Sequence, residues 1–230
     1  MDERYYEIFD FLPLEPASLG PYIDHLWGAF LALIEKEHPV KPFAILPFHL
    51  LCMFAIQYKV FRISAFHAED YLTTLGSCSV RKPNDLEMLR QNPPIRDNGG
   101  VIPSHCLVSN LSYIPEGKLF DFLKIINVDS EVVEKGKELV KIRSTYAHAN
   151  GNIEENIESR IEQYFSILRL IQPKMLKLND SVAERWLEEM GMEEDGEYYI
   201  SQHLSEEYLC PADMQQGKLS KLDDRLNGKI

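Results

Sequence analysis

Arginine, serine and histidine lie close together in one short stretch, Arg-Ser-Thr-Tyr-Ala-His-Ala-Asn-Gly, which spans residues 143–151. A guanidinium can pair with a carboxylate or hold another anion. A hydroxyl can donate or accept a hydrogen bond, and an imidazole gains or loses a proton near neutral pH. If the chain brings them together, Arg143, Ser144 and His148 form a candidate site.

Arg143 falls on the predicted buried face of a helix that Asp129 or Ser130 can cap. The residues that form this face at spacings of three and four are Val132, Gly136, Leu139, Arg143, Tyr146 and Ala147. A buried guanidinium must be paired, because an unpaired charge taken out of water costs on the order of several kcal/mol. Arg143 is therefore either half of an internal ion pair or held in a cleft for an anion.

His148 lies roughly 140° around from Arg143 if the helix is continuous, so the two can converge only where the helix breaks. Asn150 and Gly151 can supply that break, because both tolerate the left-handed conformation at a helix end. Asn152 can then cap the next helix. The sequence thus predicts a cation, a hydroxyl and an imidazole at a helix end.

An arginine, a small polar residue, three further residues and a histidine at the junction of two helices resemble the R-x4-6-H motif of the HEPN superfamily. The resemblance covers residues 131–178. It implies a helical bundle and a metal-independent ribonuclease that acts as a homodimer and leaves a 2′,3′-cyclic phosphate and a 5′-hydroxyl. By this resemblance Arg143 holds the scissile phosphate and His148 is the general acid or base. Ser144 stands where the family more often has Asn, Asp or His.

Further residues complete the predicted site. Tyr146, Asn150 and Lys141 are the expected RNA-binding residues, although Lys141 lies on a helix whose acidic residues are also typical of a solvated face. Asp70 or Glu69 is expected to face the helix of Arg143 and to orient its guanidinium. The resemblance also suggests a role in a toxin–antitoxin system or in antiphage defence, with an antitoxin as a possible partner.

A second R-x4-H match runs from Arg62 to His67. It lacks a polar residue after the arginine and a helix-ending glycine, and it sits inside an apolar run, so we interpret it as a coincidence.

Composition limits the function classes. The net charge of −12 argues against a broad surface that binds nucleic acid. A chain of this charge can still carry a few arginines in a cleft that binds RNA, because charge can be distributed unevenly over the surface. Residues 1–6 lack the pattern of a secretory signal, and the apolar run 43–56 is too short to span a bilayer, so we expect a cytoplasmic protein with no membrane contact. The cysteines lack metal-site spacing, and we expect reduced thiols, no metal and no cofactor. They are Cys52, Cys78, Cys106 and Cys210.

Apolar periodicity predicts an all-α bundle over residues 1–192 and a peripheral, partly ordered tail over residues 193–230. Within the predicted bundle, residues 77–114 contain four prolines and are predicted to form a long irregular connection, either a lid or a surface loop. The predicted helices cover residues 18–38, 48–75, 118–126, 130–147, a long stretch that ends near Pro173, and 180–190.

Two other classes of protein fit the same residues. In one, the helices form a non-catalytic interaction or dimerisation domain and Arg143 is part of a structural ion pair. In the other, the bundle binds a nucleotide.

Overall fold

The computed structural model describes residues 3–13, 20–35, 40–78, 89–90, 109–147, 156–190 and 210–215. The helices, with 3-10 helices labelled η, are η1 (Glu3–Glu7), α1 (Ile8–Phe11), α2 (Gly20–Ile34), η2 (Lys41–Ala44), α3 (Ile45–Phe66), α4 (Ala68–Gly76), η3 (Ser109–Tyr113), α7 (Glu116–Leu119), η4 (Phe120–Ile126), α8 (Ser130–Ala147), α9 (Ile157–Met190) and α11 (Pro211–Gln215). These described segments contain no strand, and the predicted all-α bundle is confirmed.

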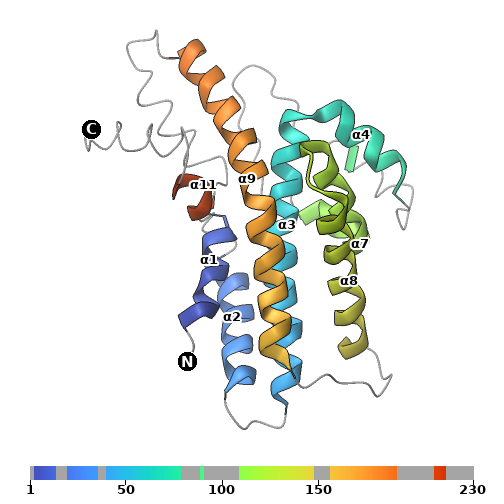
Figure 1. Cartoon of the computed structure of the whole chain (residues 1–230), viewed down its shortest axis with the longest axis vertical. Coiled ribbons are helices and arrows are strands. Elements are labelled where there is room, and N and C mark those ends of the chain that lie inside the picture. Colours follow the sequence, from blue (N-terminus) through green and yellow to red (C-terminus); the bar gives the residue numbers. More distant parts are fainter. Residues whose placement is uncertain are drawn as a thin grey trace, which may run out of the picture.

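Helices α3 and α9 run side by side along the centre of the bundle, with α1 and α2 on one side and α7 and α8 on the other (Figure 1). Helix α3 is apolar on most of its circumference, as expected of a helix that is surrounded by others. Within the described segments, Lys41–Ser64 is long and apolar enough to cross a membrane, and most of it is buried inside the bundle.

The predicted helix over residues 48–75 is two helices. His67 leaves the helical conformation with φ −129° and ψ 54°, so α3 ends at Phe66 and α4 begins at Ala68. The sequence marks this place only by a change of pattern, from apolar on all sides in α3 to one buried face in α4, formed by Tyr71 and Leu75. The break turns α4 across the end of the bundle (Figure 1).

The expectation that a helix ends near Pro173 was wrong, because α9 continues through it and through the separate helix predicted over residues 180–190. A proline inside a helix leaves the carbonyl four residues earlier, that of Arg169, without its usual donor. Both Pro173 and Arg169 are exposed, so water can hydrogen-bond that carbonyl. Burial of Met175 beyond the proline keeps the helix on the core.

Helix α9 also begins later than predicted. The Oδ1 atom of Asn156 accepts a hydrogen bond from the Ser159 amide at 3.1 Å, so Asn156 rather than Asn152 caps it.

Close packing fixes α8 against the preceding turn. The helical stretch α7–η4 ends at Asn127, whose φ of 59° is left-handed. The chain then enters α8, where a Cβ atom on Gly136 would lie 2.2 Å from the Phe120 ring. Only glycine allows this approach, which brings α8 onto the α7–η4 segment and sets the distance between their side chains.

Part of the predicted tail is ordered as α11, which packs against α1 and α9 and buries Cys210 and Asp213.

Candidate functional site

Arg143 lies near the C-terminal end of α8, at the end of the bundle where α3 and α9 begin (Figure 1). The predicted stripe of α8 is buried at Val132, Gly136, Leu139 and Tyr146. Arg143 lies on the same stripe with 24% of its side chain exposed, and its Nη2 atom donates a hydrogen bond to Oε2 of Glu116 in α7. Of the two alternatives for a buried arginine, the structure shows the internal ion pair.

Two buried residues extend this pair into the core. His49 of α3 places its Nε2 atom 3.2 Å from the same Oε2 atom of Glu116 and its Nδ1 atom 2.7 Å from the hydroxyl of Tyr164 in α9. Arg143, Glu116, His49 and Tyr164, the site tetrad, thus form one chain of polar contacts from four different helices.

Protonation of the tetrad follows from its contacts. Burial raises the pKa of Glu116, but the hydrogen bonds from His49 and Arg143 outweigh it, so the pKa lies below 4.5 and the carboxylate is ionised at neutral pH. An ionised carboxylate only accepts, so His49 donates from Nε2. Its Nδ1 then accepts from the Tyr164 hydroxyl, which keeps its proton because burial raises its pKa well above 10.

His49 is held in its neutral form by its surroundings. Burial lowers its pKa below 6.5, the charge of Glu116 opposes that shift, and the charge of Arg143 adds to it. The imidazole is fully covered, so its role in this geometry is to orient Glu116 rather than to touch a ligand.

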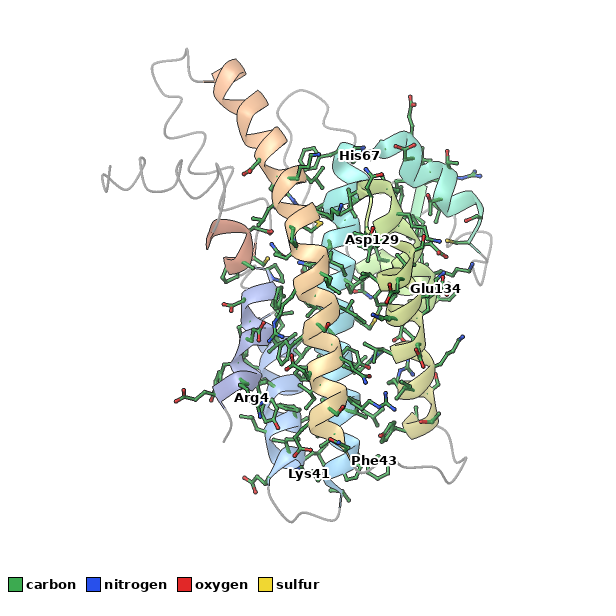
Figure 2. All side chains as sticks on the ribbon, in the orientation of Figure 1. Arg4, Lys41, Phe43, His67, Asp129 and Glu134 are labelled. Atoms are coloured by element: carbon green, nitrogen blue, oxygen red, sulfur yellow. The ribbon has the colours of Figure 1, made fainter. Side chains whose placement is uncertain are left out.

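The carboxylate that contacts Arg143 is Glu116, not Asp70 as predicted. Asp70 lies in α4, at the other end of α3, and a helix that rises about 1.5 Å per residue keeps the two ends far apart. Its side chain is 70% exposed and lies 4.0 Å from His67. Figure 2 shows His67 at the end of the bundle opposite Lys41 and Phe43.

Other predicted site residues are scattered around the end of α8. The hydroxyl of Ser144 donates to the carbonyl of Val140 in its own helix, at 3.1 Å. Lys141 is exposed. Tyr146 has only 6% of its surface exposed and packs in the core, which leaves little of it for a ligand. His148 and Asn150 follow directly after α8 but lie outside the described residues.

The described residues contain no group of three or more His, Cys, Asp and Glu side chains that could hold a metal ion. Cys52, Cys78 and Cys210 are buried free thiols, and Cys106 lies outside the described part of the chain.

Three members of the tetrad were not predicted from the sequence. His49 carried a signal, because a histidine inside the apolar run 43–56 must find hydrogen-bond partners once it is buried. Glu116 directly follows Pro115 at the start of a helix, where a carboxylate is common for local reasons. Tyr164 looked like any other residue of the apolar face of α9.

The fold and the site define an all-α bundle with a partly exposed, carboxylate-paired arginine near one end. Comparison with models of known families, with curated proteins and with solved structures found no match to this chain.

Proposed function

We propose that the chain is a metal-independent endoribonuclease that acts as a homodimer, with Arg143 as the group that holds the scissile phosphate. One observation carries this proposal. Nη2 of Arg143 is bound by Glu116, while 24% of its side chain is exposed. The carboxylate orients the guanidinium, and its exposed part is accessible to a phosphate oxygen.

The proposed reaction needs proton transfer and charge stabilisation only. The 2′-oxygen of the ribose attacks phosphorus, a base removes its proton, the bond to the 5′-oxygen breaks, and an acid protonates that leaving oxygen. Arg143 would neutralise charge on the phosphate oxygens. His148, which directly follows α8, is assigned to proton transfer through the R-x4-6-H resemblance.

Dimerisation follows from the sparseness of this site. One arginine and one histidine cannot supply a phosphate clamp, a base and an acid at once, whereas two copies that meet across a two-fold axis can. A setting in a toxin–antitoxin system or in antiphage defence, with an antitoxin partner, rests on the family resemblance alone.

The test is digestion of transfer RNA and total RNA by the purified protein in EDTA, with analysis of the new ends. The wild type is expected to leave 2′,3′-cyclic phosphates, and His148→Ala is expected to lose roughly 10²-fold or more of the cleavage rate. His67→Ala is the matched control, because it alters the histidine of the other R-x4-H match and should cleave like the wild type. A folded wild type that leaves all RNAs intact would contradict the proposal.

The competing function is a non-catalytic interaction domain, which the tetrad itself favours. The ion pair with Glu116 and its continuation to His49 and Tyr164 give Arg143 a complete structural role at the junction of four helices. In that case Arg143→Ala lowers the stability of the protein, and neither the wild type nor the variant cleaves RNA. Sedimentation of the wild type should then show self-association or a bound protein partner. A monomer with no partner would contradict an interaction domain.

A further inference from the structure

The short helix α11 builds its own N-terminal cap. Pro211 occupies the first helical position, where its missing amide proton costs nothing. The Oδ2 atom of Asp213 accepts a hydrogen bond from the Cys210 amide at 3.1 Å, and the Asp213 amide donates to the Cys210 carbonyl at 2.9 Å. Five residues are too few to hold a helix in water, so α11 depends on what it contacts in the bundle.

The second oxygen of Asp213 connects α11 to the centre of the bundle. Its Oδ1 atom accepts a hydrogen bond from Nε2 of Gln172 in α9 at 2.5 Å. The Oε1 atom of Gln172 accepts in turn from the ammonium of Lys59 in α3 at 3.2 Å. The Gln172 amide therefore links the Lys59 ammonium to the Asp213 carboxylate, and all three side chains are buried.

Lys59 is an unusual residue for the middle of a core helix. Besides Gln172, it lies over the ring of Phe11 at 5.8 Å from the ring centre, so within the described segments both of these contacts are with neutral groups. A buried ammonium surrounded by neutral groups is costly unless a negative charge lies close by. Asp213, one amide away, supplies that charge.

Two further donors lie on the faces of α3 and α9 that carry Lys59 and Gln172, because Asn179 follows Gln172 by seven residues, about two helical turns. Arg62, three residues further along α3, donates from Nη2 to Asn179 at 2.9 Å. Burial lowers the pKa of Arg62 to about 10, and the charge of Asp213 acts in the opposite direction. The Nδ2 atom of Asn179 is buried and has no hydrogen-bond partner. The four side chains, called here the donor cluster, are Lys59, Arg62, Gln172 and Asn179.

We propose that the donor cluster is a buried binding site for a small oxoanion, which the carboxylate of Asp213 fills in this structure. A free carboxylate or a phosphate can then take its place when Asp213 is absent, and α11 docks on the bundle because it carries such a group. This site is separate from the tetrad and does not depend on the proposed ribonuclease activity.

The experiment is chemical rescue of the full-length Asp213→Ala variant. Thermal unfolding is followed by circular dichroism in sodium formate, sodium acetate, sodium phosphate and, as the reference, sodium chloride at equal ionic strength. The variant is expected to melt below the wild type in chloride and to recover part of the lost Tm in an oxoanion, because a ligand that binds only the folded state raises Tm. Formate and acetate test carboxylates, and phosphate tests phosphates.

Two further variants make the result specific. Asp213→Asn fills the same space, so its Tm should respond to formate no more than to chloride. Lys59→Met combined with Asp213→Ala removes the cation and should abolish the rescue. If Asp213→Ala does not fold in chloride, recovery of its helical signal on addition of formate becomes the readout. Equal effects of formate and chloride on Asp213→Ala, or equal rescue with and without Lys59, would overturn the proposal.

Discussion

The chain contains two R-x4-H stretches, Arg62 to His67 in α3 and Arg143 to His148 at the end of α8, and the structure places their arginines in opposite environments. Arg62 is 4% exposed, donates to Asn179 and lies 5.0 Å from the centre of the Phe66 ring. Arg143 has 24% of its side chain exposed, and its Nη2 atom is bound to Glu116. Identical spacing has placed one arginine inside the core and the other at a partly exposed position.

The difference comes from position in the bundle rather than from the motif. Arg62 lies four residues before the end of α3 and faces α9, and only 4% of it is exposed, so any ligand would have to displace core side chains. Arg143 also lies four residues before the end of its helix, α8, but 24% of its side chain is exposed there. The R-x4-H spacing and a nearby helix end are therefore common to both arginines, and burial in the bundle distinguishes them.

Substitution of the two arginines should show the largest contrast. Arg62→Ala is expected to lower the free energy of unfolding by about 3–5 kcal/mol, because it leaves Asn179 unsatisfied in the core. Arg143→Ala should cost about 1–3 kcal/mol, since solvent reaches both partners of its ion pair. Urea unfolding at neutral pH measures both values. An Arg143→Ala cost equal to that of Arg62→Ala would mean that Arg143 is as structural as Arg62.

Gly136 offers a way to disturb only the Arg143 side of the comparison. In Gly136→Ala the new methyl group meets the Phe120 ring, and displacement of α8 should cost about 1–3 kcal/mol despite the better helix propensity of alanine. Gly28→Ala is the matched control, because a Cβ atom there meets nothing within 4 Å, and it should be neutral or slightly stabilising. Chemical denaturation measures the free energy of unfolding of both variants. An unchanged value for Gly136→Ala would show that α8 can shift away from Phe120 at no cost.

Much of the fold was predictable because it depends on local pattern. The stripe of α8 and the end of that helix were read from spacing alone, and Arg143 was correctly expected to need a partner. The identity of that partner was not predictable, because Glu116 and His49 come from helices whose relative placement depends on packing such as that of Gly136 on Phe120. Continuity of α9 through Pro173 was missed for the same reason, since tertiary burial outweighed the local signal.

Glu116→Gln tests how far Arg143 depends on its carboxylate. Loss of the negative charge should cost about 1–2 kcal/mol of stability and, under the proposed function, reduce RNA cleavage because the guanidinium is no longer held in place. Asp70→Asn is the matched control, since that carboxylate is exposed at the other end of the bundle and should change neither quantity. Urea unfolding measures the change in stability, and single-turnover kinetics measure the change in the RNA cleavage rate. An unchanged cleavage rate with lowered stability would show that Glu116 serves the fold alone.

The smallest expected effect is the pH dependence that His49 imposes on the tetrad. Its pKa in the folded protein lies below the unfolded value of 6.5, so the unfolded chain binds the proton more readily. Stability from neutral His49 is therefore complete above pH 6.5 and is lost as pH falls from there toward the folded pKa. Protonation would also give Nδ1 a hydrogen and force the Tyr164 hydroxyl to stop donating to it.

Removal of the imidazole should flatten this dependence. His49→Leu is expected to be less stable than the wild type at neutral pH, because it removes the acceptor of the Tyr164 hydroxyl. As the pH falls from 6.5 to about 4.5, below which protonation of Glu116 also contributes, the variant should lose less stability than the wild type. His67→Ala, at the exposed histidine of the other R-x4-H stretch, should keep the wild-type slope. Urea unfolding across that pH range measures the free energy of unfolding of each variant. Parallel plots of this free energy against pH for His49→Leu and the wild type would show that His49 does not cause the pH dependence.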